Sequence, residues 1–453
     1  MVTGGIGSVS SGGSASQVGG QGSSPTPSMS GAGSGGQSGA APLAKTEVIA
    51  EPVDDARDVF GEETVRVYDI TVSPADLARI DQDPAGEEYI AGSIAVDGSP
   101  IGDIGFRYKG SVGAFLAPCT ATTSVGQATG AKTGKCSMKV AFDHVDPEMR
   151  YRGLRKLNFH SMNQDPSMLR ERLAYGLFRE MGIAAPRAMH ARVNINGKFE
   201  GLFIAVEQID GRFTRSRFSE GGKGNLYKEV WPMHDSADVY RAALETNEDE
   251  NPVLDRIVKF AAATKLGAAA VEEHVDRAYV TRYLAADRVM ANDDGSAHWW
   301  CLAIGQGNNP GGTGNHNYYW YEEELAGRFW LLPWDMDSSL GATSFVRIQP
   351  EWRTKAPCAC SGNPPQRPTS CDPLFAAWAE WNSDYEAAVD EFLSGPFAAS
   401  RVEDKLARWS NQIRPAVTEA AGRNGAPAVA TWELAGTLLR VAIDSLRQNR
   451  GSP

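Results

Sequence analysis

The stretch FWLLPWDMDSSLG, residues 329–341, joins an apolar run to two carboxylates, Asp335 and Asp337. The run is typical of a buried strand, and the serines and Gly341 that come after it indicate a turn. Carboxylates at a rigid strand end suit Mg²⁺ when the ion also holds phosphate oxygens. We therefore predict a metal site here, with Asp337 as a second ligand or as the N-cap of the next segment. The alternative is a strand that ends in ordinary solvated acids.

The first part of the 453-residue chain differs in composition from the rest. Residues 1–45 are dominated by Gly, Ser, Ala, Pro, Gln and Thr and contain no aromatic residue. Such a segment buries too little apolar surface to offset chain entropy, so we expect a disordered tether. All 11 Trp and 16 Phe lie beyond it, which is enough for a large core.

Charge and hydropathy exclude several classes of protein. The net charge of -12 argues against a nucleic-acid binder and favours a basic, Lys/Arg-rich protein partner. No run of about 18 apolar residues is present, so we expect no transmembrane segment. The first thirty residues lack the basic start and apolar centre of a secretory leader, although such a tether is also what remains after a leader is removed. The oligomeric state is left open.

The six cysteines predict disulfides rather than a metal site. Cys119 and Cys136 would close one loop, and Cys371 would pair with Cys358 or Cys360. A zinc knuckle needs two residues between its cysteines, and Cys-Ala-Cys at 358–360 has one. Disulfides favour a location outside the cytosol, either secreted or on a cell or spore surface.

Local patterns predict a sheet-rich part followed by a helical part. Alternating strands occupy 65–72, 89–98, 99–111, 137–142, 154–161, 192–195 and 199–208, with turns at Asp97-Gly98 and Asn196-Gly197. A helix opens at Asp165 and runs to the stop at Gly182. Beyond residue 210 we expect short strands at 224–230 and 316–321 and helices at 251–260, 276–290, 374–393, 401–419 and 431–448.

This order of elements is that of phosphotransferases that hold ATP between two lobes. Phosphoryl transfer needs a turn over the phosphates, a lysine fixed by a glutamate, a carboxylate near the attacking hydroxyl, and metal ligands. Gly110, Ser111 and Gly113 are candidates for the turn, Lys139 or Lys156 for the lysine, Glu171 for its partner, Asp294 for the base, and Asn317 with Asp335 for the metal.

The chain resembles the CotH-type spore coat kinases, an atypical protein-kinase-like family. The resemblance rests on the blocks FRYKGS, SMKVAF, LNFHSMNQDPSMLRERLAYGLFREMGIAAPRA, VNINGKFEGLFIAVEQID, GNLYK, NDDGSAH, HNYYWY and LLPWDMDSSLG, which occur in the family's order. It implies an α+β, two-lobed protein-kinase-like fold. An antiparallel sheet lobe with one helix would span residues 65–210 and a mostly helical lobe residues 211–450, together forming one domain.

The resemblance also implies ATP, Mg²⁺ or Mn²⁺, and transfer to Ser/Thr of secreted, surface or coat proteins. Asp294 then corresponds to the catalytic aspartate and Asp335 to the metal aspartate. Arg107, Glu207 and Lys228, in three of the shared blocks, complete the predicted nucleotide-binding set.

Two departures from ordinary kinases leave alternatives open. The HRD and DFG tripeptides are absent, and the loop GQGNNPGGTGN stretches the interval between Asp294 and Asn317. Asp293 is an alternative base to Asp294. A pseudokinase that binds nucleotide and acts as a scaffold is therefore the alternative function. A carbohydrate-binding surface module, suggested by the tether and the many tryptophans, is a further one.

Overall fold

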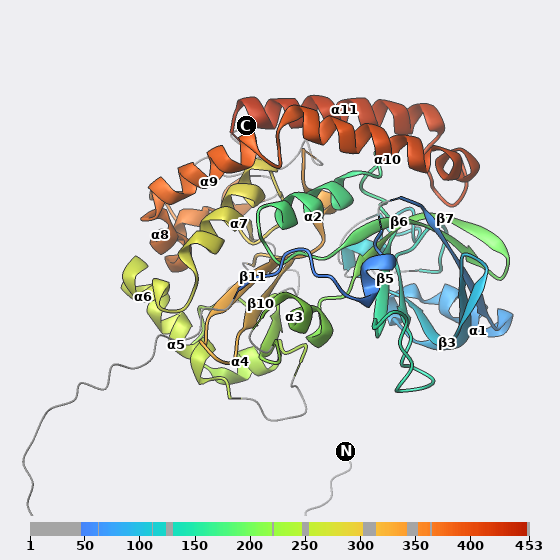
Figure 1. Cartoon of the computed structure of the whole chain (residues 1–453), viewed down its shortest axis with the longest axis horizontal. Helices are drawn as coiled ribbons and strands as arrows, with labels where there is room; N and C mark the ends of the chain where they lie inside the picture. Colours follow the sequence, from blue (N-terminus) through green and yellow to red (C-terminus); the bar gives the residue numbers. More distant parts are fainter. Residues whose placement is uncertain are drawn as a thin grey trace, which may run out of the picture. The chain divides into compact units, whose positions relative to one another are not determined.

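Seven strands close into a barrel in the order β1-β2-β3-β4-β5-β7-β6 (Figure 1). Their bounds are β1 Arg66–Val72, β2 Ile90–Val96, β3 Ser99–Tyr108, β4 Met138–Ala141, β5 Lys156–His160, β6 Ala188–Ile195 and β7 Lys198–Glu207. All neighbours pair antiparallel except β1 and β6, which pair in parallel and close the barrel.

The structure is a computed structural model that describes part of the chain. It describes residues 47–450 except 62, 111, 124–129, 220–221, 247–252, 302–313, 342–351 and 363–364. The predicted tether at 1–45 and Ser111 of the predicted phosphate turn therefore lie outside the described residues.

The expected two-lobed protein-kinase-like fold with an antiparallel sheet lobe is wrong. The sheet is mixed and closed, and residues 44–453 form one compact unit. The error has a physical origin, because turn signals report only antiparallel pairing between strands that are neighbours in sequence. The pairing of Asp69 with Asn194 joins distant strands and has no local signal.

The two predicted hairpins form at the predicted dipeptides. Asp97 and Gly98 have φ of 50° and 78°, and Asn196 and Gly197 have φ of 49° and 74°. Two consecutive positive φ angles define the turn whose twist matches that of the paired strands, and Asn, Asp and Gly adopt them at low cost. These turns join β2 to β3 and β6 to β7.

Strand β7 contributes side chains to both hydrophobic cores. Phe203 and Ala205 point into the barrel with the inward residues of the other strands. Leu202, Ile204 and Val206 point outward into a second, larger core. A strand buried on both faces is a continuous apolar run, as GLFIAV in this strand shows.

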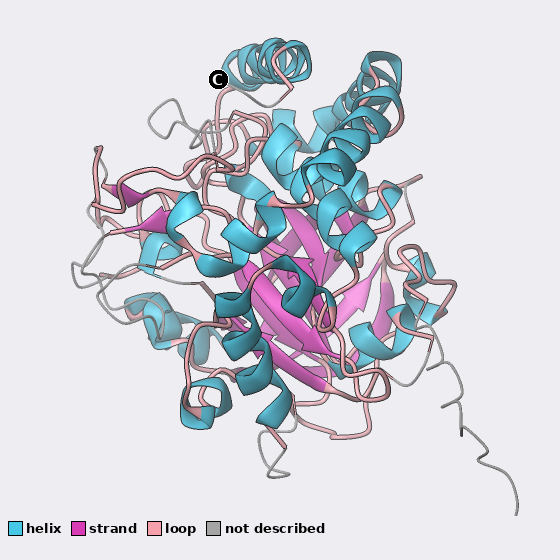
Figure 2. Cartoon of the chain, turned by 90° about the vertical axis from the view of Figure 1, so that its left-hand side faces the viewer, coloured by secondary structure: helices cyan, strands magenta, loops and turns pink. Residues whose placement is uncertain are grey.

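The second core lies among helices and a small antiparallel sheet of order β11-β10-β8 (Figure 2). The strands of that sheet are β8 Asn225–Lys228, β10 Tyr318–Glu322 and β11 Phe329–Pro333, and a two-stranded ladder joins β9 Trp299–Trp300 to β12 Gln366–Arg367. The α-helices are α1 Pro74–Gln82, α2 Arg170–Glu180, α3 Gly211–Arg217, α4 Ala237–Arg241, α5 Asp255–Ala263, α6 Ala268–Glu272, α7 Arg277–Val289, α8 Pro373–Ala379, α9 Asn382–Ser394, α10 Ala399–Ala420 and α11 Val429–Gln448. Helix α2 begins later than predicted, because the Asp165 carboxylate accepts the Arg170 N–H from outside the helix at 2.8 Å.

Three disulfides join the six cysteines. The predicted Cys119–Cys136 bond is confirmed, and of the two alternatives for Cys371 the partner is Cys358. The third bond joins Cys301 to Cys360. None of the described helices is long and apolar enough to cross a membrane.

Glu207, predicted to bind nucleotide, instead lies at the centre of a buried ion network. Its carboxylate pairs with Arg187 at 2.7 Å, with Arg212 at 3.0 Å and with Arg217. Asp54 binds Arg187 and Arg212 from the other side. Burial alone would raise the pKa of Glu207, but the charges of Arg217 and Arg187 lower it from 4.5 to about 2.

We expect Glu207→Gln to lower the free energy of unfolding by about 3–5 kcal/mol, because it leaves buried guanidinium groups without a counter-charge. Urea denaturation measures this loss. Since the pKa of Glu207 is lowered in the folded protein, the wild-type advantage is complete above pH 4.5 and lost as the pH falls toward 2.

Glu419→Gln is the matched control, since Glu419 forms an exposed pair with Arg192. Its loss should not exceed about 1 kcal/mol. Equal stability of the two variants would contradict a structural role for the network.

Candidate active site

A cavity lies where the outer face of strands β3 and β5 meets helix α2 and the turn after β11. It is lined by Lys109, Gly110, Ala114, Leu116, Ala117, Ser137, His160, Ser161, Met162, Asn163, Gln164, Glu171, Asp294, Asp335, Asp337 and Ser338. Three of the predicted aspartates and the predicted helix glutamate therefore share one cavity.

The β10–β11 pair brings Asn317 next to Asp335. Tyr318 is opposite Pro333 in the ladder, so the residues just outside it, Asn317 and Trp334, face each other. The Trp334 N–H donates to the Asn317 carbonyl at 3.0 Å. Asp335 comes next, with a left-handed φ of 49°, which ends the strand and leads into the 3-10 turn Met336–Ser338.

Asp294 is held by two side-chain donors. Asn317 Nδ2 donates to its Oδ2 at 3.0 Å, and Trp300 Nε1 donates to its Oδ1 at 2.9 Å. Asp294 and Asn317 are therefore neighbours in space although they are 23 positions apart in the sequence. The Asp293 N–H donates to the Ser338 carbonyl, and Asp293 is not among the residues that line the cavity.

Lys109 is the lysine in the cavity, and it is linked to Glu171 through His160. Lys109 Nζ lies 2.9 Å from His160 Nε2, and His160 Nδ1 lies 2.7 Å from Glu171 Oε1. Burial of His160 lowers its pKa to about 3, so the ring is neutral. Burial also lowers the pKa of Lys109, while Asp335 and Glu171 oppose that change.

The carboxyl groups of the cavity raise one another's pKa values. Burial, followed by Asp335 and Glu171, raises the pKa of Asp337 well above 3.8. Burial also raises the pKa of Glu171, with Asp335 adding to the effect. The pKa of Asp294 is raised to about 6, chiefly by burial. When all of these carboxyl groups are ionised they repel one another, and a bound cation would offset that repulsion.

The residues present fit a divalent cation such as Mg²⁺. Asp335 and Asp337 offer carboxylate oxygens of the kind this ion prefers. Asn317, the third predicted metal ligand, does not line the cavity, and its amide donates to Asp294. His160, Glu171 and Asp335 also offer donor atoms within 4.8 Å of one another.

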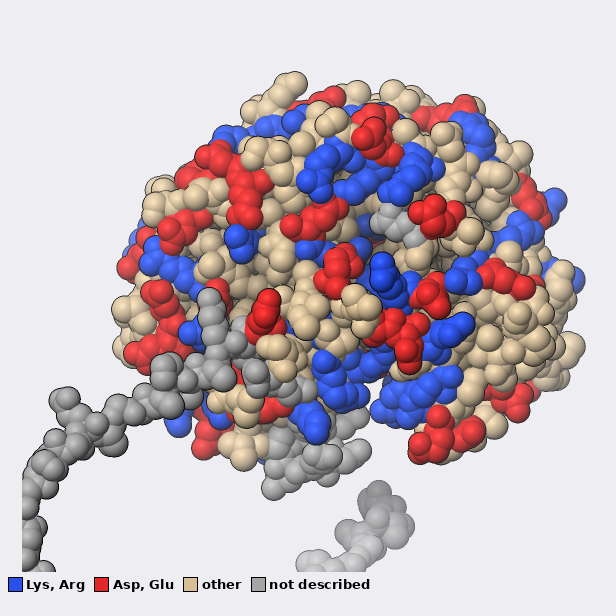
Figure 3. Space-filling view, viewed as in Figure 1, with Lys and Arg blue, Asp and Glu red and all other residues tan. Residues whose placement is uncertain are grey.

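Of the other predicted basic residues, Arg107, Lys139 and Lys156 lie along the same barrel face, and Lys228 ends strand β8 of the small sheet. None of the four lines the cavity. In the barrel, Arg107 is opposite Lys139, and Lys139 is opposite Asn158. Arg107 and Asn158 each lie two residues before a cavity residue, Lys109 and His160, on the same face of their strands. Burial, followed by the charges of Lys109, Arg107, Lys156 and Lys228, lowers the pKa of Lys139 to about 7. Arg107 itself is bound by Glu87. Figure 3 shows one face of the molecule, on which basic side chains gather around a notch at the lower edge.

Gly110 lines the cavity, but its N–H is already bonded. It donates to Glu87 Oε1 at 2.7 Å, so it is not available to a phosphate in this arrangement. Its φ of 147° and a Cβ position only 2.2 Å from the Ala114 Cβ explain why this position needs glycine. Gly113 belongs to the next 3-10 turn, Val112–Phe115.

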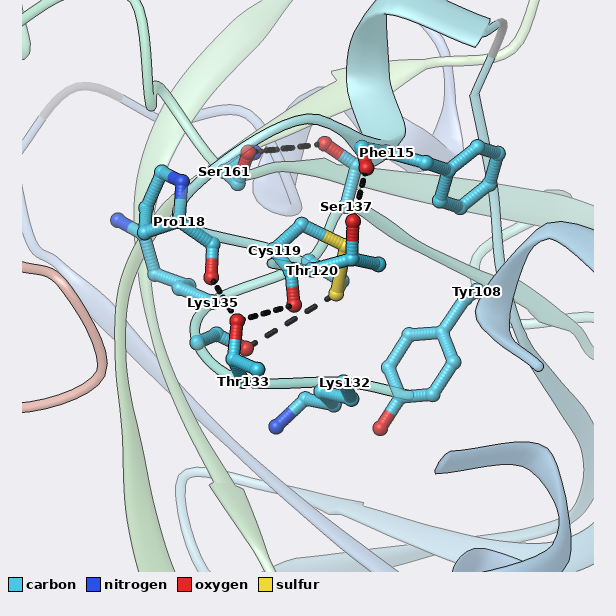
Figure 4. The surroundings of a disulfide bond; sticks show 12 residues. Tyr108, Phe115, Pro118, Cys119, Thr120, Lys132, Thr133, Lys135, Ser137 and Ser161 are labelled. Atoms are coloured by element: carbon cyan, nitrogen blue, oxygen red, sulfur yellow. Dashed lines mark hydrogen bonds between the residues drawn. A yellow bond between two sulfur atoms is a disulfide. The ribbon is translucent and has the colours of Figure 1, made fainter. Parts of the chain in front are cut away.

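The Cys119–Cys136 disulfide stabilises one wall of the cavity (Figure 4). Leu116 and Ala117 line the cavity just before Cys119, and Ser137 lines it just after Cys136. Ser137 Oγ in turn accepts the Ser161 N–H at 3.0 Å. The bond therefore ties the loop before it to strand β4.

Sequence reasoning missed Lys109, His160, Tyr175 and Trp300. Lys109 alternates with the inward residues Phe106 and Tyr108, so its outward direction was readable from FRYK. His160 alternates likewise with Leu157 and Phe159. Trp300 and Tyr175 had no such signal, because only the tertiary fold brings them to the site.

Comparison with known proteins identifies related chains. The family model described as CotH kinase protein matches residues 107–445. "Inner spore coat protein H" of Bacillus subtilis (strain 168) is 24% identical over 375 residues, covering 78% of this chain and 87% of that protein. "Inner spore coat protein H-like protein" of the same organism is 38% identical over 55 residues, covering 12% of this chain and 18% of that protein.

We expect Asp337→Asn to raise the unfolding temperature of the metal-free protein by a few degrees at pH 8. The folded-state pKa of Asp337 is raised, so ionisation above that pKa costs stability that asparagine does not lose. The gain should shrink as the pH falls toward 3.8, which calorimetry in EDTA at several pH values checks. Asp235→Asn, at a carboxylate that is 81% exposed, should show no such gain, and a destabilised Asp337→Asn would contradict this picture.

Proposed function

The chain belongs to the CotH kinase protein family, and on this premise we propose that it transfers the γ-phosphoryl group of ATP to a protein hydroxyl. The observation that supports this most is the shared cavity, in which Lys109 faces Asp294, Asp335 and Asp337. A cation-binding acidic group beside a lysine and a hydrogen-bonded aspartate provides the charges that phosphoryl transfer needs.

The residues divide into two sets with different roles. Lys109 would contact nucleotide phosphates, Asp335 and Asp337 would hold Mg²⁺ or Mn²⁺, and Asn317 would hold Asp294 in place. When bound, the cation neutralises charge on the phosphate oxygens.

Asp294 would act as the base. The acceptor oxygen forms a bond to the γ-phosphorus, the bond from that phosphorus to the bridging oxygen breaks, and ADP leaves with the electron pair. The proton of the acceptor hydroxyl passes to the Asp294 carboxylate. Its pKa of about 6 suits a base that works near neutral pH, and Trp300 and Asn317 fix its orientation. Asp293 is the less suitable base because it does not line the cavity.

For the substrate we propose Ser/Thr in a basic segment of a spore coat or other surface protein. The net charge of -12 favours a basic partner. The relative named as an inner spore coat protein suggests the spore surface, and three disulfides suit a location outside the cytosol.

We expect Asp335→Ala to abolish Mg²⁺-dependent transfer of labelled phosphate from ATP to the chain itself or to a basic Ser-rich peptide. Asp294→Asn should lower kcat about 10²–10⁴-fold, because the variant keeps the size of the side chain but cannot accept the proton. Unfolding temperature confirms that both variants fold.

Asp235→Asn, on the surface, is the activity control and should behave as wild type. Full activity of Asp335→Ala would refute the metal assignment. A wild-type protein that ATP and Mg²⁺ stabilise against heat, but that transfers no phosphate, would contradict the enzyme and favour a nucleotide-binding scaffold.

Comparison of two alanine variants tests which lysine contacts the phosphates. Lys109→Ala should raise KM for ATP at least ten-fold, the loss expected for one charge-assisted contact in a cavity. Lys139→Ala should have a smaller effect, because Lys139 lies one step along the strands from the cavity. The reverse order would return the role to Lys139, one of the two lysines that the sequence suggested.

A further inference from the structure

His160 stands between the cavity lysine and the helix glutamate, and these two side chains have no direct contact among the hydrogen bonds and ion pairs of the described residues. We propose that His160 is a positioning residue that sets Lys109 on the nucleotide phosphates, so that a Lys109–His160–Glu171 relay replaces a direct lysine–glutamate ion pair. This inference rests on the proposed function and adds a residue to it.

The partners of His160 assign its tautomer. A lysine ammonium group has three donors and no acceptor, so His160 Nε2 accepts from Lys109 at 2.9 Å. The hydrogen of the neutral ring is then on Nδ1, which donates to Glu171 Oε1 at 2.7 Å. Both ring nitrogens are then used, and these directions hold for an ammonium at Lys109 and a carboxylate at Glu171.

Packing fixes the plane of the ring. His160 is 5% exposed and meets the Trp334 ring edge-on, with centroids 5.6 Å apart. Lys109 Nζ lies over the same indole at 5.6 Å from its centroid. The relay therefore has little freedom to turn away from the cavity.

Helix α2 connects the relay to the metal aspartate. Glu171 and Tyr175 are one turn apart on α2 and face the same side. The Tyr175 hydroxyl accepts the Asp335 N–H at 2.9 Å. Helix α2 thus positions Lys109 through Glu171 and His160, and it positions the Asp335 backbone through Tyr175. The proposed phosphate contact and the proposed metal ligand are therefore held by the same helix.

A competing role for His160 is that of a metal ligand. Its Nδ1 lies 3.9 Å from Asp335 Oδ1, within a group of donors that could hold an ion. However, Nε2 accepts from Lys109 and Nδ1 donates to Glu171, which leaves no ring lone pair for a metal. The observed hydrogen bonds therefore favour the relay.

His190 supplies a matched control. It is 1% exposed, its Nδ1 lies 2.9 Å from Arg172 Nη1, and its Nε2 lies 2.6 Å from the Met168 carbonyl. It is thus equally buried and equally bound to a cation, but it does not line the cavity. Loss of either ring should cost similar stability, whereas only loss of His160 should change Lys109.

The test compares His160→Leu with His190→Leu in the full chain. Leucine has neither a donor nor an acceptor, so it cannot bridge Lys109 and Glu171. We expect the Kd for MgATP, measured by calorimetry, to rise about ten-fold in His160→Leu and to stay within about two-fold in His190→Leu. The unfolding temperatures should fall alike. Equal MgATP affinities of the two leucine variants would overturn the relay.

Nitrogen NMR of the metal-free protein tests the relay independently of nucleotide. His160 should show a protonated Nδ1 and an unprotonated Nε2 whose shift changes in Lys109→Met. A protonated Nε2, or a Nδ1 signal that responds to added Mn²⁺ or Zn²⁺ as a ligand does, would overturn it. A wild-type protein that binds no MgATP but shows the expected tautomer would refute the proposed function and leave the Lys109–His160–Glu171 geometry intact.

Discussion

Burial of strand β7 on both faces is the constraint on which the other elements depend. Its inward side chains complete the barrel core, and its outward ones begin the larger helical core. Register places His160 of β5 opposite Ile204, whose side chain points outward, so His160 also faces the helices. The polar residues of the active site therefore lie where the outer barrel face stops being apolar.

The ionisable groups buried in the cavity lower the stability of the folded protein. Burial and mutual repulsion raise the pKa values of Glu171, Asp294 and Asp337, and Lys109 is the lysine in the lining. A fold selected only for stability would replace such groups with apolar or neutral ones. Their presence, together with the pairing of Asn317 with Asp294, is consistent with the proposed binding of a cation and an anionic nucleotide.

The relay through His160 also changes how helix α2 contributes to the site. A direct ion pair would require Glu171 to reach the lysine itself. Here an imidazole ring spans that distance, with one donor and one acceptor. A neutral ring also avoids placing a further charge among the carboxylates. This arrangement suits a barrel whose closed sheet fixes how far β3 and β5 lie from the helix.

From its residues alone, the chain specifies the strand that comes before Asp335, the hairpins at Asp97-Gly98 and Asn196-Gly197, one disulfide and its family, because these depend on local turn chemistry and short motifs. Other features depend on strand register and long-range pairing. These are the closure of β1 against β6, the position of Lys109 rather than Lys139 in the cavity, and the position of Glu207 in a buried network of arginines. Lysines on neighbouring outward positions look alike in sequence. Only the three-dimensional packing of the barrel against α2 determines which of them meets His160.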